Sequence, residues 1–407
     1  MEKQIWKYAL TSTLISLCVI GFGRMSYGII MPFMKESLSL TYQQAGLLGT
    51  VTAVGYLSLI LLVGIFAVKW GSRKLIIIGT LLVTCGFFYL TWAQNLHSCM
   101  VGMFLLGIGA AFTYTPLVNI MVGWYPKQRG MMIGFVISGL GLGSLISSLL
   151  IPVFIGWFST NGWRYLWLFF SLITLISSFV SYGTLRDPPT VLQKTEQKRH
   201  TFVRDVYLNK KVILVSVIYG LIGFAYLMPQ SFLFSFLLEA HINQYSASHI
   251  MSLGSIMSIF SGPLWGTISD KIGRKTSMLV TLFLAAVSMI IPIVYPVYVG
   301  FVICQILWGI TYVGILSLIQ ALSTEQVHQA FAPVALGYAT AYFAVGQFIG
   351  PGLGGWFIDY LGGIPSALFL CSGLLLLAFV LSTQLNKKAK EVLEYEKIDD
   401  LAETQKK

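Results

Sequence analysis

Long apolar runs alternate with short polar breaks along almost the whole chain. Each run is about 20 residues or longer, which is the length that an α-helix needs to cross a bilayer. In lipid, a helix satisfies its own backbone hydrogen bonds, so runs of this length predict helices rather than strands of a barrel. Twelve such spans are predicted, at residues 8–34, 43–68, 75–93, 98–124, 131–156, 163–185, 211–238, 247–268, 276–294, 297–323, 333–357 and 364–385.

The composition strengthens the prediction of an all-α membrane protein. Of the 407 residues, 56% are hydrophobic and 10% are charged, whereas soluble proteins carry about 25% charged residues. The mean hydropathy is +0.78. No small-residue cleavage site follows the first run, so we interpret it as a retained span and not as a removed signal. The five cysteines are scattered through apolar runs, which indicates neither a disulfide framework nor a metal site.

The basic residues predict an orientation in the membrane. The net charge is +11. If the N-terminus lies inside, all Lys and Arg residues except Arg24, Lys35 and Arg164 fall in inner loops or in the tail. Such a bias predicts a plasma-membrane protein with both termini in the cytoplasm. Because the charges are spread over every inner loop, we expect no nucleic-acid partner.

The polar breaks divide the chain into two halves. The segment 186–210 contains Pro188 and Pro189 and a run of mixed charge, which is typical of a linker. We therefore predict an N-terminal six-helix bundle at 1–185, a cytoplasmic linker at 186–210, a second bundle at 211–387 and a solvated tail at 388–407. The segment 64–73 recurs as 266–275, and parallel repeats of this kind are common in transporters.

The second copy of this repeat reads Gly266-x-x-x-Asp270-Lys271-x-Gly273-Arg274-Lys275. It resembles the loop signature of the major facilitator superfamily. The resemblance implies twelve helices in two bundles around a central cavity, with these loops gating the inner side. The alternative is that the loops only determine topology. The gating candidates are Gly64, Lys69, Gly71, Arg73, Arg129, Gly266, Asp270, Lys271, Gly273 and Arg274.

The two loops differ at the acidic position of the signature. Val68 stands in the first copy where Asp270 stands in the second. A carboxylate at this place can pair with a cation or with a helix end. We therefore expect the two halves to gate asymmetrically.

Arg24 is the one basic residue that the pattern places deep inside a span. A guanidinium in hydrocarbon is costly unless it faces a protein interior or water. The segment Arg24-x-x-Tyr27-x-x-x-Met31-Pro32-Phe33 is similar to the first span of organophosphate antiporters and anion/cation symporters. In those antiporters and symporters an arginine at this place binds the substrate anion, whereas the alternative is a structural arginine bonded to carbonyl groups. The preceding Gly21-Phe22-Gly23-Arg24 also resembles the YbfB-like bacterial branch.

The repeat also says something about the charge of the substrate. Phosphate transporters of the superfamily add a second arginine in the seventh span, and Tyr226 occupies that position here. The departure favours a monoanion. In this fold the first, fourth, seventh and tenth helices line the cavity, which gives as substrate-binding candidates Arg24, Tyr27, Tyr114, Asn119, Tyr226, Gln230, Gln305, Trp308 and Tyr312.

Several features are missing from the sequence. No carboxylate lies in the middle of a span, where proton relays usually lie. No phosphate-binding loop indicates ATP as the energy source, and no nucleophile–base pair indicates an enzyme. We expect no metal and no cofactor. The motif Gly346-x-x-x-Gly350-Pro351 resembles one that antiporters carry in a different span, so we interpret it as a helix-packing motif.

These observations predict a monomeric secondary transporter of a small organic anion, most simply a carboxylate. It would work by alternating access as a proton symporter or an anion exchanger, with the substrate, protons and the lipid bilayer as its partners. The alternative is an exporter of apolar neutral or cationic drugs or metabolites, which would use the aromatic side chains for cation–π contacts. A membrane sensor without transport is a third class, for which we would expect an appended soluble domain.

Overall fold

The computed structural model describes residues 2–125, 128–188, 206–327 and 332–385. The predicted tail and most of the predicted linker lie outside the described residues. The twelve predicted spans are confirmed, and the first of them consists of three consecutive helical segments. The elements are α1 (Glu2–Ser16), the π-helix η1 (Leu17–Met25), α2 (Tyr27–Ser37), α3 (Tyr42–Trp70), α4 (Ser72–Thr91), α5 (Leu96–Trp124), α6 (Arg129–Phe158), the short 3₁₀ turn η3 (Ser159–Asn161), α7 (Gly162–Thr184), α8 (Lys210–Glu239), α9 (Gln244–Ile272), α10 (Arg274–Val294), α11 (Tyr298–Thr324), α12 (Ala332–Leu361) and α13 (Ile364–Thr383).

Length and hydropathy agree with a chain that crosses a membrane many times. Eight segments of the described chain are long and apolar enough to span one, and a single segment, Met131–Thr184, holds both α6 and α7. The helices α3, α9 and α12 are 29, 29 and 30 residues long, which exceeds the roughly 20 residues that a crossing needs.

Local sequence fixes where several helices begin. Thr41 and Gln44 form a capping box at the start of α3, and Asn95 and Ser98 form another at the start of α5. Asn243 accepts a hydrogen bond from the backbone N–H of Ser246 and so begins α9. Such caps satisfy backbone donors that have no partner within the helix.

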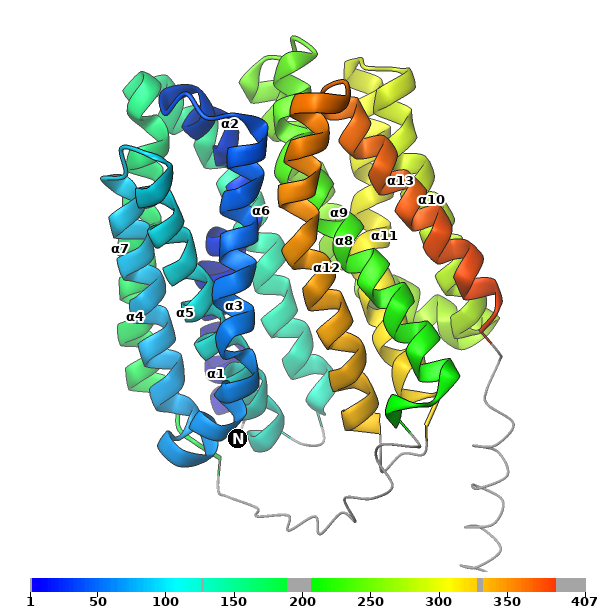
Figure 1. Ribbon diagram of the computed structural model, residues 1–407. Coiled ribbons are helices and arrows are strands. Elements are labelled where there is room, and N and C mark those ends of the chain that lie inside the picture. The colour runs from blue at the N-terminus through cyan, green and yellow to red at the C-terminus, as the bar shows by residue number, and fades with distance from the viewer. Residues whose placement is uncertain (1, 126–127, 189–205, 328–331, 386–407) are drawn as a thin grey trace, which may run out of the picture.

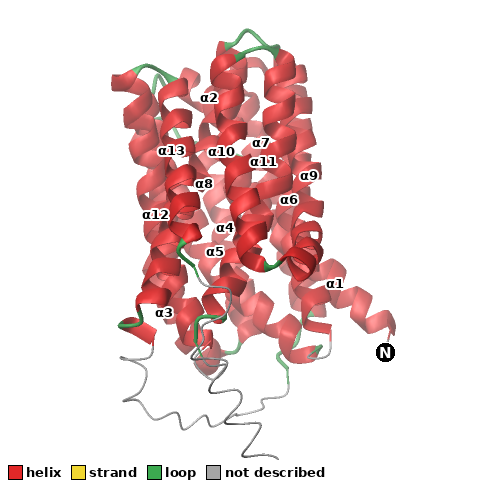
Figure 2. Ribbon diagram, turned by 90° about the vertical axis from the view of Figure 1, so that its right-hand side faces the viewer, coloured by secondary structure: helices red, strands yellow, loops and turns green. Residues whose placement is uncertain are grey.

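The helices form two bundles that stand side by side (Figure 1). One bundle holds α1 to α7 and the other holds α8 to α13. The pairs α3 with α12, α6 with α9, and α2 with α8 join the bundles along a seam. Figure 2 shows the same arrangement from the side, with α1 leaning outward near the N-terminus. We call the end of the molecule where α1 begins the basic end, and the opposite end the far end.

At the far end the two bundles touch through glycines. A Cβ atom at Gly28 of α2 would overlap the carbonyl oxygen of Gln230 in α8. A Cβ atom at Gly46 of α3 would likewise overlap the carbonyl oxygen of Pro351 in α12. Small residues let helix backbones approach this closely, and such contacts drive helix association in lipid. The far end of the seam is therefore closed backbone against backbone.

A carboxylate on one bundle also caps a helix of the other bundle at the far end. Asp359 of α12 accepts hydrogen bonds from the backbone N–H groups of Tyr42 at 3.1 Å and Gln43 at 2.7 Å. The Tyr42 hydroxyl donates to Glu239 of α8 at 2.5 Å, and Lys35 lies over the Tyr42 ring. A carboxylate at a helix N-terminus is stabilising, so these bonds reinforce the closed far end.

The basic end of the seam is different. A Cβ atom at Gly64 of α3 or at Gly337 of α12 would meet nothing within 4 Å, and the same holds for Gly134 of α6 and Gly266 of α9. Figure 1 shows α3 and α12 lying close at the far end and separating toward the basic end. Backbone contacts thus join the described parts of the bundles at the far end, and α3 and α12 diverge toward the basic end.

We predict that replacing Gly28 by alanine opens the far end. The methyl group cannot be accommodated beside Gln230, and overpacking of this kind costs about 1–3 kcal/mol. Ser235 of α8 is 1% exposed and faces Met31 of α2 across the seam. In a Ser235→Cys, Cys85→Ser background, the introduced thiol should react with a water-soluble maleimide about tenfold faster in Gly28→Ala.

The matched control is Gly373→Ala in α13, because a Cβ atom there meets nothing within 4 Å. It should leave the labelling rate unchanged. Equal rates for Gly28→Ala and its parent would contradict this description of the seam.

Candidate functional site

Arg24 lies in a π-helical segment in the middle of the first span. The backbone N–H of Ser26 donates to the carbonyl of Gly21 at 3.1 Å, which is the i to i+5 spacing of a π-turn. Gly21 packs on Gly143 and Gly139 of α6, so the wide turn lies directly against its neighbour. Single π-turns inside helices occur frequently at functional sites. The sequence analysis predicted a regular helix here and missed the π-turn.

The Arg24 guanidinium reaches across the seam. Its Nη2 donates to Oε1 of Gln347 in α12 at 2.6 Å. Its Cζ lies 5.7 Å from the ring centroid of Tyr56 in α3, within range of a cation–π interaction. Within the part of the chain that the structure describes, no carboxylate forms an ion pair with Arg24. The positive charge is therefore stabilised by a hydrogen bond to an amide oxygen and by the face of an aromatic ring.

Arg164 shows what a structural arginine looks like in this fold. Its Nη1 donates to the carbonyl groups of Thr91 at 3.1 Å and Ala93 at 2.5 Å, at the C-terminal end of α4. Its guanidinium also lies 4.2 Å from the Trp163 ring centroid. Backbone carbonyls of its own bundle thus hold Arg164, whereas Arg24 bonds to a side chain of the other bundle.

Other predicted residues of the first and seventh spans lie around Arg24. The Tyr27 hydroxyl donates to the carbonyl of Ala45 at 2.6 Å. Gln230 Nε2 donates to the carbonyl of Met25 at 2.8 Å and so joins the two bundles. Arg24, Tyr27 and Gln230 line a cavity of about 20 Å³, which has room for about one water molecule.

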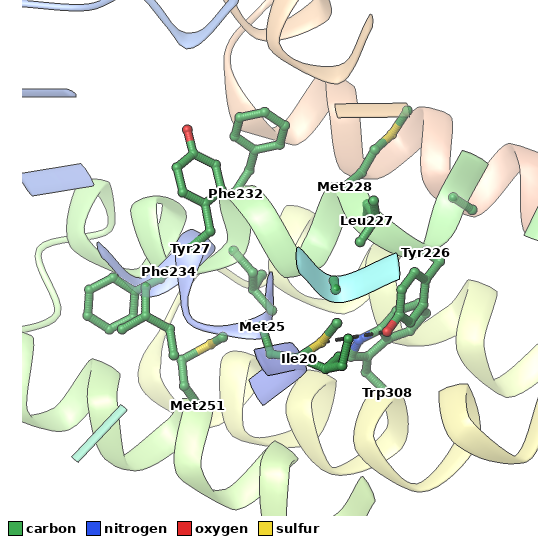
Figure 3. Packing of buried hydrophobic residues seen from close by; sticks show 14 of the residues in the cluster. Ile20, Met25, Tyr27, Tyr226, Leu227, Met228, Phe232, Phe234, Met251 and Trp308 are labelled. Atoms are coloured by element: carbon green, nitrogen blue, oxygen red, sulfur yellow. Dashed lines mark hydrogen bonds between the residues drawn. The ribbon is translucent and has the colours of Figure 1, made fainter. Parts of the chain in front are cut away.

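An aromatic cluster lies beside this cavity in the second bundle. Trp308 and Tyr312 of α11 stack with ring centroids 5.6 Å apart, and Tyr312 lies 5.6 Å from Tyr226 of α8. Figure 3 shows the Tyr226 hydroxyl turned toward Met25, with Trp308 beside them. Gln305 lines a second cavity of about 20 Å³ together with Gln230, Trp308 and Tyr312. The two small cavities share Gln230, so the predicted residues of the seventh and tenth spans do come together.

The two candidates from the fourth span differ in their placement. Tyr114 of α5 is partly buried and lies within electrostatic range of Tyr56 and Tyr226. Asn119 is exposed and lies more than one turn closer to the basic end. Among the hydrogen bonds of the described residues, none involves Asn119. Tyr114 thus lies toward Tyr56 and Tyr226, and Asn119 is exposed farther along α5.

Two neighbours of Arg24 escaped the sequence analysis. Gln347 belongs to the glycine-rich motif of the eleventh span, and Tyr56 belongs to the second span. Both helices were expected to serve packing or gating and not the cavity. A polar residue between Gly346 and Gly350 was the available signal, because a polar side chain in a close-packed helix pair needs a partner.

The first loop at the basic end is held by a carboxylate from another part of the chain. Gly71 links α3 to α4 with φ of +86°, a conformation that favours glycine. It provides no side chain to cap α4, and Asp187 accepts a hydrogen bond from the backbone N–H of Arg73 at 2.9 Å instead. The Arg73 guanidinium donates to the carbonyl of Tyr182 at 2.6 Å. Asp187 thus supplies a carboxylate to the loop whose signature has Val68.

The second loop uses different partners. Gly273 has φ of +89°, as its counterpart has, and Lys275 Nζ donates to the carbonyl of Thr383 at 2.5 Å. Arg274 forms an ion pair with Glu325 of the loop after α11 at 2.5 Å. The other gating candidates of these loops are exposed or half-buried, namely Gly64, Lys69, Gly266, Asp270 and Lys271. The side chain of Arg129 lies outside the described residues.

Comparison with known families adds to this geometry. Residues 16–383 match the family described as "Uncharacterised MFS-type transporter YbfB". The chain is 24% identical over 365 residues to the oxalate:formate antiporter of Oxalobacter formigenes, covering 86% of this chain and 84% of that protein. It is 21% identical over 386 residues to the agnestins efflux protein AgnL12 of Paecilomyces divaricatus, covering 93% and 86%.

A solved structure has the same fold. A bacterial homologue of the human lysosomal transporter Spinster, in an inward-facing and unoccupied conformation, superposes with a TM-score of 0.79 at 16% identity. The match covers 94% of this chain and 97% of that one. The fold is thus one that transporters adopt.

We predict that Asp187→Ala destabilises the protein by about 1 kcal/mol. The change removes the acceptor for the first turn of α4, and loss of a helix cap has an effect of this size. Chemical denaturation in detergent micelles measures it. Asp187→Asn is the matched control, because asparagine caps helices about as well as aspartate. An alanine variant as stable as the asparagine variant would show that Asp187 does not cap α4.

Proposed function

Because this chain belongs to the YbfB-type family of major facilitator superfamily transporters, we propose that it carries a small organic anion across the plasma membrane. The substrate class that we propose is carboxylates. The carrier works by alternating access, as an anion exchanger or a proton symporter, and its basic end faces the cytoplasm.

The placement of Arg24 is the observation that supports this proposal most strongly. The guanidinium lies at the seam between the bundles, in the middle of the first span, and among the described residues it meets only the neutral oxygen of Gln347 and the ring of Tyr56. Arg24 is partly buried, and a cation withdrawn from water without an anionic partner is costly. Its planar fork matches a carboxylate in two parallel hydrogen bonds. A substrate anion would therefore supply the charge that the protein lacks here.

The relatives alone do not choose a substrate. One relative at 24% identity is an oxalate:formate antiporter, and one at 21% is an efflux protein for agnestins. Because the two identities are so similar, we choose between these two substrate classes from the side chains at the seam. A guanidinium without a carboxylate partner favours an anion, and with one arginine instead of two, it favours a carboxylate over a phosphate ester.

Export of apolar neutral or cationic compounds is the second candidate. The stacked rings of Trp308 and Tyr312, close to Tyr226, favour it because aromatic faces attract flat and cationic molecules. Arg24 would repel a cation in the same space. A drug-sensitivity panel on a strain that lacks the protein separates the two candidates: hypersensitivity to cationic drugs would favour export.

The test of the anion proposal is carboxylate transport by Arg24 variants. Purified protein is first screened by thermal shift against formate, acetate, oxalate, phosphate, sugars and drugs, because a ligand that binds only the native state raises the melting temperature. Uptake of the carboxylate that binds is then measured in proteoliposomes. Arg24→Gln should weaken carboxylate binding about 10- to 100-fold, the value of a charged hydrogen bond. Arg24→Lys should bind at an intermediate level, since it keeps the charge and loses the fork.

Arg164→Lys is the matched control, because Arg164 bonds only to carbonyl groups of its own bundle among the described residues. It should leave carboxylate affinity unchanged. Normal carboxylate affinity in Arg24→Gln would overturn the proposal.

A further inference from the structure

We propose that Gln347 is a substrate-site residue whose carboxamide oxygen occupies the position of the substrate carboxylate on Arg24 when the carrier is empty. The anion must displace this oxygen in order to bind, and the displacement couples binding to opening of the far end. The inference rests on the proposed anion transport and adds an exchange mechanism to it.

The orientation of the Gln347 side chain follows from its partner. A guanidinium has donors and no acceptor, so the atom that faces Arg24 Nη2 at 2.6 Å is the amide oxygen. An amide oxygen has the trigonal geometry of a carboxylate oxygen and lacks its charge. Gln347 is 5% exposed and lies on α12, whereas Arg24 lies on η1 of the other bundle. The bond is therefore a neutral substitute for an ion pair, placed across the seam.

Arg24 lines a cavity of about 20 Å³ together with Tyr27 and Gln230, which is room for about one water and not for a carboxylate group. Tyr27 and Gln230 in its wall are each bonded to a backbone carbonyl. Gln347 is bonded to the guanidinium itself, so its side chain is the group that an incoming anion replaces.

A carboxylate competes well for this place. Hydrogen bonds between ionised partners are about twice as strong as those with neutral ones. Once displaced, the carboxamide can turn its NH₂ group toward the anion, because glutamine offers both donors and acceptors. Gln347 then becomes a ligand of the substrate.

The same turn of α12 holds the two bundles together. The Thr50 hydroxyl of α3 donates to the carbonyl of Phe348 at 2.9 Å, and it accepts from the backbone N–H of Gly352 at 3.1 Å. When the far end opens, α12 moves away from α3 and η1, and the Arg24–Gln347 bond breaks with these contacts. In an empty carrier the break leaves the guanidinium without an acceptor. In a loaded carrier the anion already fills that role.

Exchange of one anion for another is therefore fast, and return of the empty carrier is slow. The Ser235→Cys, Cys85→Ser background reports opening of the far end without any ligand. In empty detergent-solubilised protein, Gln347→Ala should raise the rate of maleimide labelling about tenfold, the value of a charged hydrogen bond. In proteoliposomes loaded with oxalate, net efflux by Gln347→Ala should approach the rate of oxalate/oxalate exchange, whereas the parent exchanges at least tenfold faster than it releases oxalate alone.

Gln320→Ala is the matched control. Its Nε2 donates to the Tyr219 hydroxyl at 3.0 Å, and both residues belong to the second bundle. It removes a similar hydrogen bond that does not cross the seam, so labelling of the empty protein should not change. Gln347→Glu places a fixed carboxylate on Arg24 and should keep labelling slow, with or without oxalate.

The two proposals fail in different ways. If empty Gln347→Ala is labelled as slowly as its parent, the proposed role of the Arg24–Gln347 bond in holding the far end closed is overturned, whatever the substrate is. If that variant is labelled faster but neither formate nor oxalate binds the parent protein, the carboxylate proposal fails together with the displacement step. If oxalate binds and Gln347→Ala keeps the parental ratio of exchange to net efflux, the coupling is overturned while anion transport stands.

Discussion

A positive charge away from bulk water needs an acceptor at every moment, and this constraint organises the centre of the molecule. Arg24 meets it with a side-chain oxygen from the opposite bundle and with the face of a tyrosine. Arg164 meets the same requirement with backbone carbonyls that never leave it. The difference matters because a side chain can be exchanged for a ligand and a carbonyl at a helix end cannot. The two arginines therefore illustrate a replaceable and a permanent solution to one electrostatic problem.

The two halves repeat in sequence and yet secure their basic loops differently. In both halves, the glycine that joins two helices has a positive φ, and the basic residue two positions later donates to a carbonyl near the end of the last helix of its bundle. The carboxylates come from different places, since Asp187 caps α4 in the first half and Glu325 pairs with Arg274 in the second. The expected asymmetry between the halves thus has a structural counterpart, although its source is a residue outside the signature.

The spans could be predicted from the sequence because hydropathy and length leave few alternatives in a bilayer, and most of their ends lie within a few residues of the predicted ones. The π-turn at η1 could not be predicted, because it depends on Gly21 packing against Gly143, a contact between residues far apart in the chain. Gln347 and Tyr56 were missed for a related reason. Their role depends on how closely α12 and α3 approach η1, and a single sequence does not record that distance. Asn119 shares a helix with Tyr114 but is exposed and lies more than one turn nearer the basic end, and its role in substrate binding stays a prediction.

The bare glycines at the basic end have a consequence of their own. A Cβ atom at Gly64, Gly134, Gly266 or Gly337 would touch no neighbour, yet these glycines lie on α3, α6, α9 and α12, which join the bundles along the seam. A larger side chain at any of these four positions would therefore cause no clash in the present conformation. It would clash only in a conformation in which the helices of the two bundles meet at the basic end. Replacing these glycines by alanine or larger residues would shift the equilibrium between the two conformations without changing any residue that faces the substrate. Such substitutions could therefore be used to trap one conformation.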